Sequence, residues 1–281
     1  MKKIFSSIII LPLLGCNFMD STVGPLDQDA NTGVYDIQST STKSQNNIIK
    51  NKYDTKDIAK KETIKEAKIE KTNKKPEIKT NKMKKILDVP LIRQLPELRY
   101  GCEVTSTAMM LQYAGVEVDK MDLYKAIKKD HDPLVKRKGD IIKWGNPEEG
   151  FVGDMTGKNG KPGYAVYDKV IVELVNYYLP GRAINLTGAE FDTLLKQIEN
   201  GYPVVVWTTG DYRLPDRPEK WEHNGETIVT PLDLHVVVLV GYDDHYVYLN
   251  DPLSGKKAVK VNKKQFIKSW KALKKRAVSY I

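Results

Sequence analysis

Cys102 is the residue of this 281-residue sequence with the clearest potential for nucleophilic chemistry. It precedes a run with apolar residues at helical spacing, Val104–Ala114, and Gly115 is a typical helix stop. The thiol is therefore expected in the first helical turn, where free N–H groups and the helix dipole favour thiolate over thiol. A thiolate in that position can act as a nucleophile. The alternative is a small buried cysteine that only fills the core.

A β-hairpin near the C-terminus is predicted to bring a histidine and an aspartate together. Its strands are expected at His235–Tyr242 and Tyr246–Asn250, each rich in β-branched and aromatic residues. A three-residue loop at Asp243–His245 would pair Leu239 with Leu249. Since a slip of one residue would turn every side chain to the other face, the face on which each side chain lies depends on this loop length.

In that register His235 and Asp251 lie on one face as diagonal neighbours, within reach of a hydrogen bond. A carboxylate beside an imidazole fixes its tautomer and stabilises its protonated form. Alternatively, His235 is a core histidine and Asp251 an ordinary turn residue. His245, His223 and His131 are expected in turns or loops, and their spacing gives no pair of metal ligands on one helix face.

The elements that must position these residues follow an order of helices first and strands second, which predicts an α+β fold. A short strand is expected first, at Asp88–Ile92. Further helices are predicted at Lys120–Lys129 with Asp119 as cap, Lys169–Leu179, Ala189–Glu199 and Gln265–Ala272. Further strands are predicted at Pro203–Thr209, Glu226–Thr230, Lys256–Val261 and Ala277–Ile281, with a polar excursion at Tyr212–Asn224.

The first 16 residues have the features of a targeting segment. Lys2 and Lys3 precede an apolar run, Ile4–Leu14, that is too short for a stable membrane span. The run ends in Leu-Leu-Gly-Cys16, which resembles a bacterial lipobox and implies cleavage before Cys16 and lipid attachment to its sulfur. The alternative is an ordinary signal peptide. With Cys16 lipidated, Cys102 would be the one free thiol, and no disulfide framework or Cys-rich zinc site is possible.

Residues 17–85 are dominated by Asn, Ser, Thr, Lys and Asp, which predicts a disordered tether. The chain has a formal net charge of +9, and the lysines of the tether could contact an anionic envelope or simply keep it solvated. The folded domain is expected at 86–281. Within it, Asp130–Tyr167 is rich in Gly, Pro, Asp and Lys and predicts a long functional loop that shapes the substrate cleft.

Three blocks of the sequence resemble the peptidase C39-like family of papain-fold cysteine peptidases. They are QLPELRYGCEVTSTAMML, GNPEEGFVGDMTG and LHVVVLVGYDDHYVYLNDPLSG, and the resemblance extends over Val89–Ile281. It implies a papain-like fold with Cys102 as nucleophile, His235 as general base and acid, and Asp251 as the residue that orients it. It implies also that Gln94 supplies an oxyanion-hole amide beside the Cys102 N–H. The transporter-linked members that process leader peptides are not a guide to substrate, because this chain has no transporter.

Three functions remain open on this basis. The first is a monomeric, membrane-tethered cysteine peptidase on the extracytoplasmic face of a bacterial membrane, with peptide or protein substrates, no cofactor, no metal and no nucleic-acid partner. The second is an amidase or transamidase that uses the same groups on cell-wall peptides, since fold does not fix substrate. The third is a binding lipoprotein on a catalytically idle scaffold.

Overall fold

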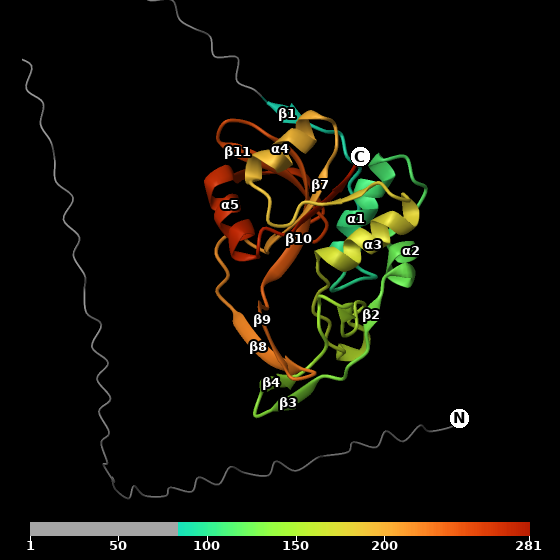
Figure 1. The fold of residues 1–281 in the computed structure, drawn as a ribbon, viewed down its shortest axis with the longest axis vertical. Helices are drawn as coiled ribbons and strands as arrows, with labels where there is room; N and C mark the ends of the chain where they lie inside the picture. Colours follow the sequence, from blue (N-terminus) through green and yellow to red (C-terminus); the bar gives the residue numbers. More distant parts are fainter. Residues whose placement is uncertain (1–83) are drawn as a thin grey trace, which may run out of the picture. The chain divides into compact units, whose positions relative to one another are not determined.

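The computed structural model describes residues 84–281, and its centre is a seven-stranded antiparallel sheet (Figure 1). The strand order is β12, β11, β10, β7, β13, β6, with β1 beside β10. These strands are β1 (Lys85–Ile86), β6 (Ala183–Asn185), β7 (Val204–Thr209), β10 (Leu234–Tyr242), β11 (Tyr246–Asp251), β12 (Lys256–Asn262) and β13 (Ala277–Tyr280). The predicted α+β class is confirmed, with helices placed against a largely C-terminal sheet.

The described part of the chain has five α-helices (Figure 1). They are α1 (Cys102–Tyr113), α2 (Lys120–Ala126), α3 (Asp168–Tyr178), α4 (Phe191–Glu199) and α5 (Lys263–Ala272). Four of them pack on the two faces of this sheet, and α2 packs on α1. Successive residues of β7 point to opposite faces. Val205 and Trp207 join the core under α1 and α3, whereas Val204 and Val206 join the core under α4 and α5. Burial on both faces explains why β7 is apolar without alternation.

Most predicted helices are confirmed at nearly their predicted bounds. The Asp119 cap is confirmed in full, because its side chain accepts from the N–H groups of Met121 and Asp122 in a capping box. The predicted strand at Asp88–Ile92 is wrong, since the strand lies earlier, at β1. Residues 87–94 are irregular. The Val89 carbonyl accepts a hydrogen bond from the side chain of Asn250 at 3.0 Å and not from the backbone of a neighbouring strand.

The segment Asp130–Tyr167 is not one long loop, as the sequence suggested, but contributes short elements to two further sheets. The parallel pair is β2 (Lys129–Asp130) with β5 (Phe151–Val152), and a 3-10 turn, η1, follows at Lys158–Gly160. A four-stranded sheet, here called the small sheet, comprises β3 (Val135–Arg137), β4 (Asp140–Lys143), β8 (Pro218–His223) and β9 (Glu226–Pro231). The expected polar excursion at Tyr212–Asn224 is therefore corrected too, because half of it is β8.

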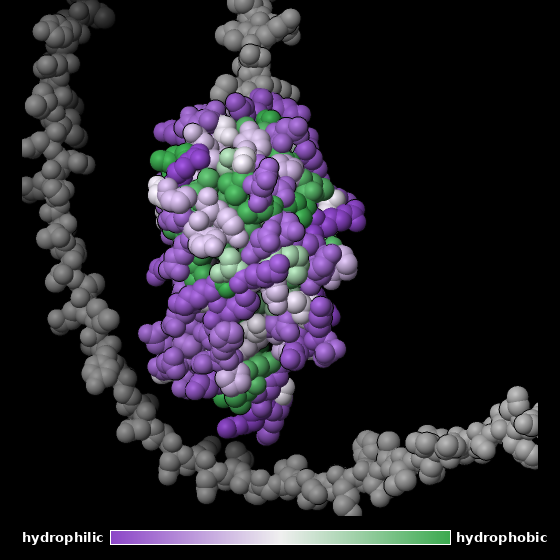
Figure 2. Space-filling view, turned by 90° about the vertical axis from the view of Figure 1, so that its right-hand side faces the viewer, coloured by the Kyte–Doolittle hydropathy of each residue, from purple (hydrophilic) through white to green (hydrophobic). Residues whose placement is uncertain are grey.

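The small sheet rests on a compact aromatic cluster. Trp144 and Trp221 have ring centroids 5.7 Å apart, and Tyr164 meets Trp221 edge-on at 5.3 Å. The end of the molecule that holds the small sheet is largely hydrophilic on the face in Figure 2, where hydrophobic residues occupy only a limited area. The small sheet thus has a packed inner side and a solvated outer side.

The predictions for Met1–Cys16 and for residues 17–83 of the tether lie outside the described residues. Within residues 84–281, none of the helices has the length and apolar character needed to cross a membrane.

Candidate active site

Cys102 is the first residue of α1, as predicted, and its thiol is buried. Helix α1 is buried along nearly its whole length and packs against β10, where the Ser106 hydroxyl donates to the Val236 carbonyl at 3.1 Å. Gly101 precedes the helix because a Cβ there would lie only 2.6 Å from the Cβ of Leu98. The Gly-Cys pair therefore brings the 94–101 segment close against the start of the helix.

The thiol of Cys102 does not rest as the expected thiolate. Burial raises the pKa of Cys102 well above its usual value, and the neighbouring Glu103 carboxylate raises it further. Backbone amides of Val236 and Cys102 favour the anion but are outweighed. The Cys102 Sγ–H donates to Glu103 Oε2 at 3.3 Å. The prediction of a dipole-stabilised thiolate is therefore wrong for this geometry, because an acidic partner and desolvation oppose the helix dipole.

Glu103 is a functional candidate that the sequence analysis missed. Its side chain is fully buried, its Oε1 accepts from the Val166 N–H at 3.0 Å, and its Oε2 faces the thiol. Burial raises the pKa of Glu103 to about 7, although the hydrogen bonds from Val166 and Cys102 lower it. Nothing in the spacing of the helix marks this residue, since a glutamate in a first helical turn is common at solvated positions.

His235 and Asp251 are brought together as predicted, through a bond from His235 Nε2 to Asp251 Oδ1 of 2.8 Å between two buried side chains. Asp251 also accepts from the Leu253 N–H on Oδ1 and from the Tyr212 hydroxyl on Oδ2, at 2.9 and 3.0 Å. Tyr212 was not expected in the site. Its place in the polar segment after β7 gave no signal of a contact with the hairpin.

The Asp251 carboxylate is held in its charged form. Burial would raise the pKa of Asp251, but the hydrogen bond and the electrostatic interaction with His235, with the Ser254 and Leu253 contacts, outweigh it and hold that pKa well below its usual range. Because Nε2 is bound to this carboxylate, Nδ1 is the ring nitrogen of His235 that can exchange a proton with a reacting group.

Gln94 lies in the segment that Gly101 packs against, and its side chain is buried. Its backbone N–H donates to the Pro252 carbonyl at 3.0 Å, which joins this segment to the residues after Asp251. Its side-chain Nε2 donates one hydrogen to the Arg99 carbonyl at 2.9 Å. An amide nitrogen carries two hydrogens, so one donor remains for another partner.

A cavity of about 300 Å³ brings three of the predicted site residues to one place, since Cys102, His235 and Gln94 all line it. Asp251 stands behind His235. Further lining residues come from the 130–167 segment and from the start of β10 and the residues just before it: Leu134, Lys136, Ile141, Trp144, Pro162, Gly163, Tyr164, Leu232 and Leu234. The remaining lining residues are Arg99, Tyr100 and Leu253.

The other histidines lie away from this cavity. His245 is exposed at the hairpin turn, and His131 is exposed beside β2, as expected for both. His223 differs from the expectation of a loop residue, because it is the last residue of β8 and is buried. Cys16, the predicted lipidation site, lies outside the described residues.

Glu103→Gln should make Cys102 more reactive at neutral and alkaline pH. Glutamine keeps an oxygen for the Val166 N–H and replaces the oxygen facing the thiol with a neutral N–H donor. Above pH 7 the wild-type carboxylate is ionised and opposes the thiolate, whereas below pH 7 it is neutral and opposes it less. The alkylation rate with iodoacetamide at pH 8 should therefore rise about tenfold, as for a pKa lowered by about one.

The control for this change is Glu117→Gln, which removes the same charge from an exposed position beyond α1. It should leave the alkylation profile unaltered. An unchanged profile in Glu103→Gln as well would show that the carboxylate does not act on the thiol.

The fold and the site geometry together define the papain-like class, in which a cysteine at a helix start faces a histidine and its carboxylate partner on an antiparallel sheet. A model of the peptidase C39-like family matches residues 86–278. The chain therefore belongs to the peptidase C39-like family.

Two relatives support this assignment. The uncharacterized protein YvpB of Bacillus subtilis (strain 168) is 41% identical over 208 residues, which is 73% of this chain and 79% of the relative. A crystal structure of a candidate C39-like peptidase from Bacillus anthracis is similar with a TM-score of 0.65 and 42% identity. That similarity covers 71% of this chain and 98% of the other.

Proposed function

We propose that this protein is a cysteine peptidase that cleaves peptide bonds through Cys102, His235 and Asp251. The observation that carries the proposal is the shared cavity: a cysteine, a histidine and a side-chain amide line it, and a charged carboxylate orients the histidine. Acyl transfer needs a nucleophile, a base, an orienting group and oxyanion donors, and each role has one candidate here.

In the proposed reaction the Cys102 thiol turns from Glu103 towards His235 and gives its proton to Nδ1. The sulfur then forms a bond to the scissile carbonyl carbon, and the oxyanion accepts hydrogen bonds from the Cys102 N–H and the free hydrogen of Gln94 Nε2. His235 returns the proton to the leaving amine as the C–N bond breaks. Water, activated by the same imidazole, releases the acyl group and restores the thiol.

The test uses the full chain with a peptidyl epoxide that alkylates activated cysteines, and then two substrate sets. Wild type should be labelled at Cys102 and should cleave members of a peptide library, and Cys102→Ala should do neither. Turnover of purified peptidoglycan fragments but not of the library would replace the peptidase proposal with a cell-wall amidase. Absence of both labelling and turnover would favour the binding lipoprotein.

The proposal includes a lipid anchor at Cys16 that holds the enzyme on the extracytoplasmic face of the membrane. It is supported by the lipobox-like Leu-Leu-Gly-Cys16 after a short apolar run. Cys16→Ser should move the protein from the membrane fraction to the soluble fraction and leave its activity in solution unchanged. A serine variant found wholly in membranes would contradict the anchor.

A further inference from the structure

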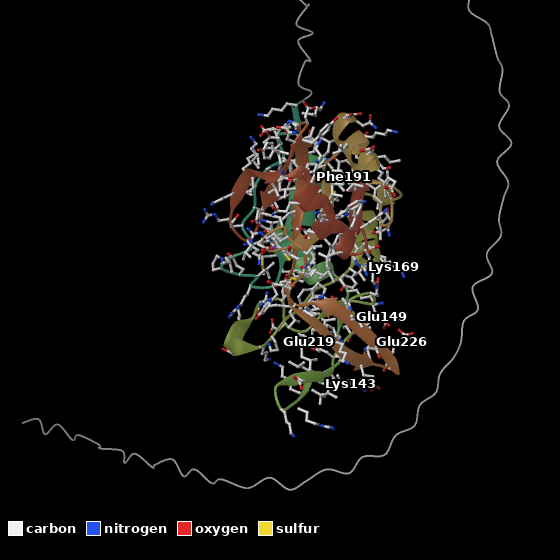
Figure 3. All side chains as sticks on the ribbon, turned by 90° about the vertical axis from the view of Figure 1, so that its left-hand side faces the viewer. Lys143, Glu149, Lys169, Phe191, Glu219 and Glu226 are labelled. Carbon is white, nitrogen blue, oxygen red and sulfur yellow. The ribbon has the colours of Figure 1, made fainter. Side chains whose placement is uncertain are left out.

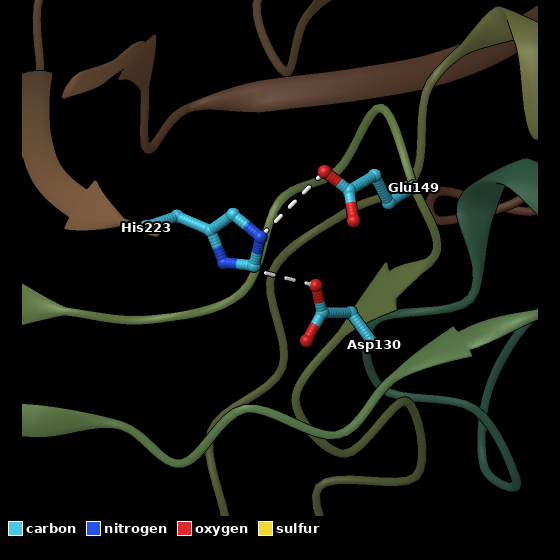
Figure 4. Close-up of side chains that lie close together, drawn as sticks. All are labelled: Asp130, Glu149 and His223. Atoms are coloured by element: carbon cyan, nitrogen blue, oxygen red, sulfur yellow. Dashed lines mark ion pairs between the residues drawn. The ribbon is translucent and has the colours of Figure 1, made fainter. Parts of the chain in front are cut away.

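A second group of polar side chains gathers at the edge of the small sheet, where Asp130, Glu149 and His223 converge (Figure 4). None of the three lines the Cys102 cavity. Each can place one ligand-type atom within 4.8 Å of those of the other two. They come from three separate segments: the end of β2, the Gly145–Gly150 turn and the end of β8. This cluster is independent of the function proposed above.

The imidazole of His223 is oriented so that one nitrogen is available as a ligand. Nδ1 lies 3.3 Å from the Trp144 carbonyl oxygen and 3.4 Å from Asp132 Oδ2, two acceptors that require a proton on Nδ1, and Asp130 Oδ2 lies farther from it, at 4.0 Å. Nε2 then carries the lone pair, 3.6 Å from Glu149 Oε1. The exposed side chain of Asn224 donates to Nε2 at 3.0 Å and can leave to solvent. Metal-binding histidines typically donate their other ring N–H to a carbonyl or carboxylate in this way.

The two carboxylates are held in place by the glycine-rich motif that starts at Gly145. Backbone N–H groups of Asp132 and Asn146 donate to the two oxygens of Asp130 at 2.8 and 2.9 Å. The Asn146 side chain donates to Glu149 Oε1 at 3.0 Å. A Cβ on Gly145 would lie 2.6 Å from the Asp130 carboxyl group, so only glycine permits this approach. The motif is thus built around Asp130.

The charge of the cluster is unbalanced. Asp130 has only 8% of its side chain exposed, and Asp132 and Glu149 lie beside it. Within residues 84–281, the ion pairs of these three carboxylates are with His223 alone, and no Lys or Arg pairs with them. The buried carboxylate of Asp130 is unfavourable without a cation, and a divalent ion would neutralise it, whereas the side chains of Asp132 and Glu149 are 39% and 56% exposed.

We propose that Asp130, Glu149 and His223 bind a divalent transition-metal ion of the zinc type, with water completing its coordination. One imidazole nitrogen and two carboxylate oxygens suit Zn²⁺, and Asp132 and the Trp144 carbonyl orient the histidine. The ion would join the β2 end, the glycine-rich turn and β8. Because Trp144 also lines the Cys102 cavity, the ion would hold this part of the cavity lining in place.

The test is calorimetric titration of ZnCl₂ into the full chain, produced without a histidine tag and treated with a chelator. We expect one saturable site per chain and a higher melting temperature with Zn²⁺. Glu149→Gln should weaken binding by at least about tenfold, as expected when a group that holds a metal is lost. Since the Glu149 side chain is 56% exposed, this variant should fold normally.

Two control variants separate a built site from adventitious binding. His131→Gln removes an exposed histidine adjacent to Asp130 and Asp132, and Glu219→Gln removes a carboxylate from the same strand as His223 (Figure 3). Both should retain wild-type affinity. The proposal is overturned if no saturable binding is seen, or if His131→Gln abolishes binding while Glu149→Gln has no effect.

Discussion

His235→Ala should lower kcat/KM for any peptide that the wild-type protein cleaves by roughly 10²–10⁴-fold, the usual contribution of a general acid and base. Without the imidazole, no group accepts the Cys102 proton, and none returns it to the leaving amine. The resting thiol makes the loss severe, because burial and Glu103 already hold the proton on sulfur. The measurement is steady-state turnover of a peptide identified in the library screen.

Two further variants make this result specific to the site. Asp251→Asn keeps the side-chain shape but loses the charge that stabilises the imidazolium, so its rate should fall less than that of His235→Ala. His245→Ala removes an exposed histidine from the hairpin turn and should not alter turnover. Comparable rates in wild type and His235→Ala would exclude His235 as the proton carrier.

In the hairpin, the contact between His235 and Asp251 could be predicted from the sequence, but the strand register close to the turn could not. The sequence predicts Leu239 opposite Leu249 and, closer to the turn, Gly241 opposite Val247. The first pairing is confirmed, but Gly241 lies opposite Tyr248 and Tyr242 opposite Val247, so the turn has one more residue than expected. A bulge between Leu239 and Gly241 restores the predicted register on the side away from the turn, where Leu239 pairs with Leu249.

The bulge lies where β1 approaches β10 closely, a contact that the periodicity of the sequence does not reveal. Gly241 lies against β1, where a Cβ would come within 2.4 Å of the Lys85 carbonyl oxygen. The added strand thus needs a glycine at this point of β10. His235 and Asp251 stay on one face because the extra turn residue and the bulge cancel each other.

The elements around Cys102 were predictable because each carries a local signal. Apolar residues at helical spacing and Gly115 mark α1, and the capping aspartate marks α2. The small sheet carries no such signal. Its β3 and β4 are three and four residues long, and β4 pairs with β8, at Lys143 and Glu222. Pairing between strands so far apart in the sequence depends on tertiary packing around Trp144 and Trp221. The sequences of such short strands do not indicate which strand each will pair with.

The same limit applies to the site. Cys102, His235 and Asp251 could be related through one helix start and one hairpin. Glu103 and Tyr212 could not, because their roles depend on which residues the fold buries beside them. A glutamate next to the nucleophile becomes significant only when its other oxygen is found on the Val166 N–H, with no solvent around it.

Gln94→Ala should reduce kcat by about 10²–10³-fold with little change in KM, as for the loss of other oxyanion donors. The alanine side chain has no N–H to offer the developing oxyanion, whereas ground-state contacts with the rest of the cavity persist. The bond to the Arg99 carbonyl is lost as well, so the 94–101 segment could loosen. Thermal melting of the variant should accompany the kinetics.

Gln94→Glu and Gln112→Ala complete this experiment. Glutamate at position 94 has the size of glutamine but places negative charge next to the oxyanion, so it should be at least as harmful as alanine. Gln112 is a matched glutamine on α1 whose Nε2 donates to the Val118 carbonyl at 2.8 Å, outside the cavity. Its replacement by alanine should lower the melting temperature slightly and leave kcat unchanged. Equal kcat losses in Gln94→Ala and Gln112→Ala would mean that Gln94 acts through folding stability and donates nothing to the transition state.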